Sequence, residues 1–196
     1  MAVSGPAAAE PAGPVLETAR LILRPPRLED FDAWAACAAD PAANQFLGGP
    51  QPRPVAWRAF VAMAGSWSLY GFAMFSAIEK HSGRWIGRLG PWRPDGWPGN
   101  EIGWGLAHEA EGRGYAFEGA VAAIDWAFAT LGWDAIIHCI DPGNVRSEAL
   151  ACRLGSQRLR RAVLPPPTST EITVWGQSRA EWRASAAQRA AGGLPR

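Results

Sequence analysis

The sequence predicts an α/β (α+β) fold in which a single domain carries helices on both faces of a mixed sheet. Two observations lead to this prediction. Strand-like and helix-like patterns alternate along the chain, as they do in layered α/β domains. The 196 residues, 48% of them hydrophobic, suit one domain with one sizeable core. We place that domain at residues 15–184, after an extension at 1–14 that we expect to be disordered and before a tail at 185–196 that we expect to fray.

The first elements are a strand and two helices. Residues 20–25, RLILRP, form the strand, which ends at its prolines. The first helix lies within residues 28–40, where apolar side chains recur at helical spacing. The second helix follows Pro54, and we expect it to bury one face. That face consists of Trp57, Phe60, Val61, Ala64 and Trp67.

Three strands follow in the middle of the chain. Residues 72–80 are apolar at odd and even positions, which fits a strand covered on both faces. Residues 84–90 return after the turn HSG and complete a hairpin. Residues 100–107 form the third strand, in which two glycines indicate a bulge or the close approach of another group to the backbone.

A long helix is predicted from Tyr115, and Gly132 is suited to end it in the left-handed conformation. Apolar side chains step by four and three along one of its faces, namely Phe117, Val121, Ile124, Phe128 and Leu131.

The last third of the chain continues the alternation. A strand at 134–140, the turn DPGN and a helix at 145–154 come first. Residues 158–164 and 171–176 then form an antiparallel pair of strands. Ser178 and Glu181 have the spacing of a capping box, which predicts a short final helix.

Composition excludes several classes of protein. The chain has 19 Lys and Arg against 18 Asp and Glu, so no net field would draw it onto nucleic acid or an anionic membrane. No signal peptide or membrane-spanning run is evident, and we expect a cytoplasmic protein. Three cysteines without CxxC spacing argue against a disulfide framework and against a metal site.

The stretch EGRGYA, residues 111–116, links a strand to the helix that begins at Tyr115. The first N–H groups of a helix have no intrahelical partners and attract anions, so this link is suited to a pyrophosphate. The glycines at 112, 114 and 119 do not match the GxGxxG spacing of dinucleotide-binding folds, and the chain has no Gly-Lys-Ser/Thr phosphate loop. A glycine-containing turn without a ligand remains the alternative.

Over more than fifty residues, the segment from GWGLA through EGRGYA and DPGNVRS to CRLG resembles the core of the GCN5-related N-acetyltransferase superfamily. LETARLILRPPRLEDF and DPGNVRS resemble the branch that contains ribosomal-protein alanine N-acetyltransferases. The resemblance implies a mostly antiparallel sheet with a central V-shaped splay. It also implies acetyl-CoA as acyl donor and, as acceptor, a small-molecule amine or a protein N-terminus.

The resemblance also assigns residues to the cofactor. The strand residues that would pair with the pantetheine arm, the loop residues that would bind the pyrophosphate, and one side chain before the next helix are Trp104, Gly105, Leu106, Gly112, Arg113, Gly114, Tyr115, Ala116 and Asn144. Arg113 is equally compatible with a solvated loop arginine, and Asn144 with a plain turn residue. Glu111 stands where the family has Gln or Arg, and we expect its carboxylate to point away from the phosphates.

The chemistry requires that the acceptor amine lose a proton and that the departing thiolate be helped by a donor. Glu101 is our first choice for the base, ahead of His138 and His108, although a strand Glu that pairs with a cation is the alternative. Many superfamily members use a Tyr as the acid, but Ala151 stands at that position. Ser147 could replace it, or could serve only the first turn of its helix.

Substrate choice is assigned to the two N-terminal helices and to residues 90–100, GPWRPDGWPGN. Trp92 and Trp97 in this loop would form an aromatic wall for an amine, or would only fix the loop to the sheet. The missing Tyr and Glu111 leave open a second function, a non-catalytic acyl-CoA-binding or regulatory module. The sequence also leaves a homodimer open.

Overall fold

The computed structural model describes residues 13–186, and eight strands in it form one sheet in the order β1-β2-β3-β4-β5-β6-β8-β7. The strands are β1 (Leu16–Glu17), β2 (Leu21–Arg24), β3 (Phe75–Glu79), β4 (Trp85–Trp92), β5 (Glu101–Leu106), β6 (Ala135–Ile140), β7 (Gln157–Val163) and β8 (Glu171–Ser178). The helices are α1 (Phe31–Ala39), α2 (Pro41–Asn44), α3 (Arg53–Tyr70), α4 (Tyr115–Trp126), α5 (Val145–Arg153) and α6 (Arg179–Ala184). Most of the predicted extension and tail, residues 1–12 and 187–196, lies outside the described residues.

The predicted order of elements is confirmed, with short additions at β1 and α2. Residues 127–131 continue α4 as a π-helical turn, and Gly132 ends it in the left-handed conformation at φ 68°. The capping box of α6 forms between Ser178 and Glu181. β3 is buried along its whole length, as its apolar pattern predicts.

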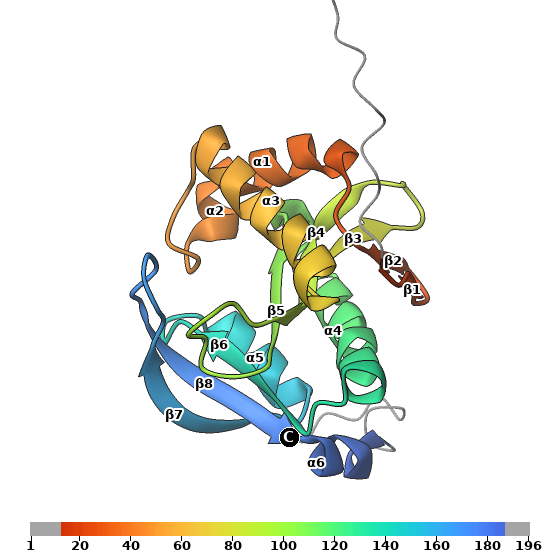
Figure 1. The fold of residues 1–196 in the computed structure, drawn as a ribbon, viewed down its shortest axis with the longest axis vertical. Coiled ribbons are helices and arrows are strands. Elements are labelled where there is room, and N and C mark those ends of the chain that lie inside the picture. Colours follow the sequence, from red (N-terminus) through yellow and green to blue (C-terminus); the bar gives the residue numbers. More distant parts are fainter. Residues whose placement is uncertain (1–12, 187–196) are drawn as a thin grey trace, which may run out of the picture.

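The sheet divides between β5 and β6. Every other neighbouring pair in the sheet is antiparallel, whereas β5 and β6 are parallel and pair at one position, Glu101 with Ile137. Beyond it the strands diverge, and Figure 1 shows β4 and β5 upright while β6 and β8 run diagonally. The V-shaped splay implied by the resemblance is therefore present, with Glu101 at its closed end.

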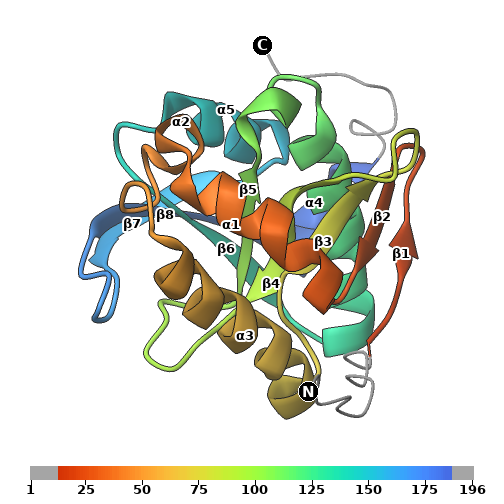
Figure 2. The same cartoon turned by 90° about the horizontal axis from the view of Figure 1, so that it is seen from above.

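Helices cover both faces of the sheet. Adjacent residues of a strand point to opposite faces. The Arg88 guanidinium lies over the ring of Trp34 in α1, whereas Leu89 packs against Gly119 in α4. Figures 1 and 2 show α1 and α2 together on one side of the molecule, and Figure 1 shows α3 running from them toward α4, where the rings of Trp67 and Trp126 lie 6.0 Å apart. We call the face that carries α1 the α1 face.

The predicted buried faces of two helices are only partly right. On α3, Trp57 and Val61 are each 41% exposed, and the buried stripe is Ala56, Phe60, Met63 and Trp67. On α4, the fully buried positions are mostly small, because the helix lies so close to β4 that a Cβ added at Gly119 would be 2.5 Å from Leu89 Cδ2. Larger side chains such as Phe117 are pushed to the margins and are only partly buried.

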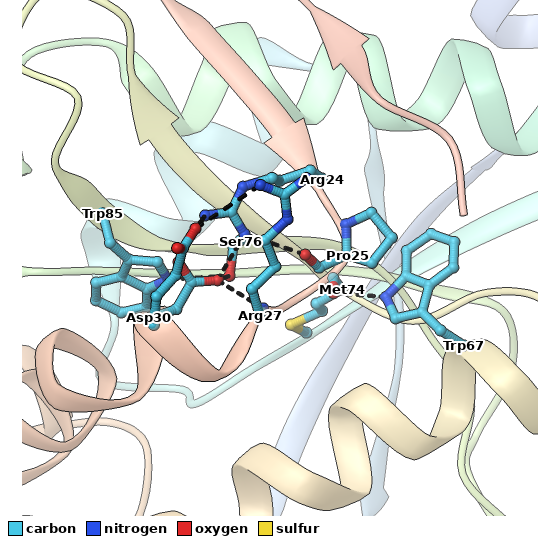
Figure 3. A network of polar contacts seen from close by, with 9 residues as sticks. Arg24, Pro25, Arg27, Asp30, Trp67, Met74, Ser76 and Trp85 are labelled. Carbon is cyan, nitrogen blue, oxygen red and sulfur yellow. Dashed lines mark hydrogen bonds and ion pairs between the residues drawn. The ribbon is translucent and has the colours of Figure 1, made fainter. Parts of the chain in front are cut away.

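A buried polar network joins the N-terminal segment to the sheet (Figure 3). The Asp30 carboxylate, 3% exposed, accepts two hydrogen bonds of 2.8 Å from the Arg24 guanidinium and one of 2.7 Å from Ser76 Oγ. Trp85 Nε1 donates to the same Ser76 oxygen over 3.2 Å. The segment LRPPRLED is therefore held to β3 and β4 by a buried ion pair.

β7 is the edge strand of the sheet on the side of β8. Almost all of its residues are exposed, and arginines occupy three of the four positions from 158 to 161. Arg161 pairs with Glu171 of β8, while Arg160 reaches the carbonyl oxygen of Pro98.

Candidate functional site

Glu101 opens β5 at the closed end of the splay and is 6% exposed. Its Oε2 accepts a hydrogen bond of 2.5 Å from Trp97 Nε1, and its Oε1 accepts one of 3.0 Å from the backbone N–H of Cys139 in β6. The carboxylate therefore spans the two diverging strands. The alternative in which Glu101 pairs with a cation is not realised among residues 13–186, where its hydrogen bonds come from neutral donors.

The environment of Glu101 favours its neutral form below about pH 7. Burial raises the pKa of this carboxyl to about 7, and the hydrogen bonds from Cys139 and Trp97 only partly oppose the rise. A base whose pKa lies near the working pH is half ionised there and transfers protons efficiently. This carboxyl has the pKa that a general base needs.

Trp92 and Trp97 both adjoin Glu101, but in different ways. Trp92 is the last residue of β4 rather than a loop residue, which corrects our prediction, and it lies directly opposite Glu101 in the β4/β5 ladder. Cross-strand partners share a face of the sheet. Trp97 lies in the loop and holds the carboxylate through its indole N–H. Trp97 also lines a cleft of about 610 Å³ together with Tyr70, Phe72, Arg93 and Asn100.

The glycines of β5 permit close approach, and no bulge interrupts the β4/β5 register. A Cβ at Gly103 would lie 2.4 Å from the Met74 methyl carbon. At Gly105 a Cβ would have room, with Leu47 at 3.5 Å and the Arg88 guanidinium at 3.6 Å. The one register shift on this side of the sheet is in β3, between Ala77 and Ile78.

In the stretch 111–116, a glycine in the left-handed conformation directly precedes the first residue of α4. Gly112 has φ 71° and Gly114, the N-cap, has φ 83°. Residues other than Gly adopt this region at a cost, so the turn requires glycine. The first helical hydrogen bond runs from the Glu118 N–H to the Gly114 carbonyl, which leaves the N–H groups of Tyr115, Ala116 and Phe117 ahead of the ladder. These donors suit a pyrophosphate.

Side chains around this loop form ion pairs. Arg113 Nη2 lies 3.1 Å from Glu79 Oε1, and the Tyr115 hydroxyl donates to the same carboxylate. Arg113 is therefore bound to β3, and its contact with a CoA phosphate stays a prediction. Glu111 pairs with Arg146 of α5 at 2.5 Å, so its carboxylate is directed toward the next helix.

Asn144, Ser147 and Trp104 meet where α5 begins. Asn144 caps the helix, its Oδ1 accepting from the Ser147 N–H over 3.1 Å. Ser147 Oγ accepts a hydrogen bond of 3.1 Å from Trp104 Nε1. The hydroxyl proton of Ser147 is thereby left to donate elsewhere. Trp104 follows Glu101 by three positions in β5, so the two side chains point to opposite faces of the sheet.

His138 is a structural residue of the splay. It is 1% exposed, and its Nδ1 donates to the Ile102 carbonyl oxygen over 2.6 Å because that oxygen can only accept. Its Nε2 then accepts from Ser156 Oγ at 3.1 Å. Burial lowers the pKa of His138 to about 4, so the ring is neutral at physiological pH. Both ring nitrogens are occupied, which removes it as a candidate base.

The sequence did not identify three residues near the site, namely Glu79, Arg88 and Arg146. Glu79 and Arg146 form ion pairs with residues distant in the sequence, and Arg88 takes its place from the pairing of β3 with β4. In residues 13–186 no group of three or more His, Cys, Asp or Glu side chains could hold a metal ion. In the same part of the chain no helix is both long and apolar enough to cross a bilayer.

A sheet that splays beside a helix start with N–H groups ahead of its ladder, and with a buried carboxyl at the closed end, is the arrangement that the resemblance to N-acetyltransferases implies. The comparisons with known proteins agree. The family described as "Acetyltransferase (GNAT) domain" matches residues 20–157. The chain is 32% identical over 146 residues to an uncharacterized N-acetyltransferase p20 of Bacillus licheniformis, covering 73% of this chain and 82% of that protein.

Solved structures give the same result. An acetyltransferase from Agrobacterium tumefaciens shares 33% identity with a TM-score of 0.75, over 89% of this chain and 100% of that one. A GCN5-related N-acetyltransferase from Brucella melitensis, 20% identical, shares the fold with a TM-score of 0.75 over 93% and 86% of the two chains. The chain therefore belongs to the GNAT acetyltransferase family, and it is an N-acetyltransferase.

Proposed function

We propose that the protein transfers the acetyl group of acetyl-CoA to a primary amine by direct attack in a ternary complex, with Glu101 as general base. The observation that carries the proposal is the position of Glu101: a buried carboxyl with a pKa of about 7, at the closed end of the splay. Trp97 and the Cys139 N–H hold it in place.

The residues of the splay fit acetyl-CoA, which supplies an activated acyl group. Gly112 to Ala116 would bind the pyrophosphate through backbone N–H groups, because these precede the helical ladder. Trp104, Gly105 and Leu106 lie beyond the single β5/β6 pair, so the edge of β5 is open to the pantetheine amides. Glu111 is drawn toward Arg146, which limits its repulsion of the phosphates.

The base and the acid approach the thioester from opposite faces of the sheet. Glu101 would take a proton from the amine, directly or through water, on the α1 face. Ser147 would donate its hydroxyl proton to the departing thiolate on the other face, since its oxygen is already oriented by Trp104. An α-amine has a pKa of about 8, so a base with a pKa near 7 suits an N-terminal or similar acceptor.

The acceptor is a small-molecule amine or a protein N-terminus. The resemblance of the N-terminal segment to ribosomal-protein alanine N-acetyltransferases supports an N-terminal amine. Trp92, Trp97 and the adjoining cleft are the surfaces that would contact it. The cleft has the size of many small-ligand sites.

Acetyl-CoA titration by calorimetry, followed by thiol release with a panel of amines and peptides, tests the proposal. We expect binding, turnover, and slower amide hydrogen exchange at Trp104 and Leu106 with acetyl-CoA present. Absence of acetyl-CoA binding would overturn the proposal. Binding without turnover of any amine would favour the non-catalytic acyl-CoA-binding module, which Ala151 in place of the usual Tyr also favours.

A further inference from the structure

Arg88 lies in a row of side chains that crosses the sheet on the α1 face. The register aligns Arg24 of β2, Ser76 of β3, Arg88 of β4 and Gly105 of β5. Cross-strand partners share a face, so two arginines flank Ser76 in this row. Arg24 is at the N-terminal side, and Arg88 is beside the strand proposed to hold acetyl-CoA.

The two arginines differ in their partners. Arg24 forms two hydrogen bonds of 2.8 Å with Asp30. The Asp30 carboxylate accepts hydrogen bonds from Arg24, Ser76 and the Arg27 N–H, and no hydrogen bond or ion pair among the described residues joins it to Arg88. Among residues 13–186, the Arg88 guanidinium has no carboxylate partner and no hydrogen-bond acceptor, and it lies over the ring of Trp34 at 4.7 Å.

The five N–H donors of a guanidinium form hydrogen bonds with water when the group is exposed, and a cation–π contact with one ring compensates only weakly for their loss. Arg88 is partly buried between α1 and the sheet. Burial lowers the pKa of its guanidinium, and only the Cys37 thiol opposes this, which is the environment of a cation without an anion beside it. A buried charge is usually paired. Arg88 is therefore a partly buried cation for which residues 13–186 supply no anionic partner.

The space beside Arg88 is open. Gly105 leaves room for an added carbon between Leu47 Cδ1 at 3.5 Å and the Arg88 guanidinium at 3.6 Å. Leu47 is 46% exposed, so solvent reaches this side. Glu101 leaves the same face of β5 four residues earlier, ~13 Å along the strand. A ligand on this face can therefore meet both Glu101 and Arg88.

We propose that Arg88 binds an anionic group, a carboxylate or a phosphate, carried by the acceptor several bonds away from its reacting amine. The inference rests on the acetyl-transfer function proposed above and names its substrate class: amines that also carry an anion, such as short peptides with a free C-terminal carboxylate. Arg88 would then act as a specificity-determining residue, with its donors satisfied only when the acceptor is bound.

The test compares matched acceptors with the wild-type protein. Diglycine and triglycine are compared with their C-terminal amides, and phosphoethanolamine with ethanolamine, by thiol release at saturating acetyl-CoA. We expect kcat/KM to be about tenfold to hundredfold higher for the anionic member of at least one pair, as for a charged hydrogen bond. The pair that shows the preference distinguishes a carboxylate from a phosphate.

Variants locate the effect. Arg88→Gln should remove the preference, Arg88→Lys should retain part of it, and the KM for acetyl-CoA should not change. Arg183→Gln, an exposed arginine on α6, is the matched control and should keep the preference. Equal turnover of the paired acceptors by wild type refutes the proposal even where Arg88→Gln does not fold, and Arg88→Lys is the second variant that assigns a preference to this residue.

The outcomes separate the two proposals. Equal turnover of acids and amides, or a preference that survives Arg88→Gln, overturns the role of Arg88 and leaves the acetyltransferase intact. Binding of acetyl-CoA without acetylation of any anionic amine in the panel also overturns it. Absence of acetyl-CoA binding overturns the proposed function itself, and the inference with it.

Discussion

Replacement of Glu101 by Gln isolates the role of the buried carboxyl, because it keeps the size of the side chain and removes its charge. If Glu101 is the base, kcat/KM should fall by about a hundredfold to ten-thousandfold. The wild-type rate should rise through about pH 7 as Glu101 becomes ionised, and should level off only once the acceptor amine is deprotonated as well. The variant should lack that limb and show only the ionisation of the acceptor amine.

The same substitution has a consequence for stability. The pKa of Glu101 is about 7 in the folded protein against the ordinary 4.5, so the folded state binds more protons than the unfolded state between these values. Stability is then lost as the pH rises through this window. At about 1.4 kcal/mol for each pH unit, wild type should lose about 2–3 kcal/mol relative to Glu101→Gln between pH 5 and pH 8.

Urea unfolding of both proteins at the two pH values, beside steady-state thiol release, measures both effects. Parallel stability curves would contradict a buried, mostly neutral carboxyl at acid pH. Retention of wild-type kcat/KM by Glu101→Gln would remove Glu101 as the base. The two readouts are independent, since a carboxyl can be buried without being catalytic.

Three further substitutions test other parts of the site and fold. Ser147→Ala should lower kcat by about tenfold to hundredfold without changing acetyl-CoA affinity, and an unchanged kcat would leave Ser147 as a helix-start residue held by Trp104. Asp30→Ala should cost about 3–5 kcal/mol in urea unfolding because it strands the buried Arg24 cation, and a loss below about 1 kcal/mol would refute the importance of that pair. For His138, the pKa of about 4 lies below the ordinary 6.5, so the folded state binds fewer protons and wild type loses stability as the pH falls through this window. His138→Asn should be less stable at pH 7 because it loses the ring's packing and its hydrogen bonds to Ile102 and Ser156, and thermal unfolding should show that gap narrowing toward pH 5; a constant gap would argue that the ring is not held neutral.

Local sequence pattern was sufficient for most of the fold. The period of the helix from Tyr115, the doubly buried strand around Phe75 and the capping box at Ser178 all depend on neighbours in the chain. The close approach of α4 to β4 does not, and so the small buried face around Gly119 was not predicted. Tertiary distance decides which residue of a helix is buried.

The candidate site divides in the same way. The position of Glu101 followed from the strand that leads to the cofactor loop, whereas its contact with Cys139 spans 38 residues of chain and its pKa depends on burial. Trp92 was assigned to a loop because Gly90 and Pro91 precede it, but antiparallel pairing with β5 extends the strand through it. Arg88 could not be identified from the sequence, because its place beside Ser76 depends on the strand register and the use of Asp30 by Arg24 depends on tertiary contacts.

The arginine-rich outer strand β7 also affects how copies of the protein meet. An exposed strand edge offers unpaired backbone groups that could continue the sheet into a second molecule. Two β7 edges brought together would oppose arginines at residues 158–161 to arginines, and each would lose water. Repulsion between these arginines therefore opposes edge-to-edge pairing of two sheets at low ionic strength. Added salt screens the repulsion and should make such pairing easier.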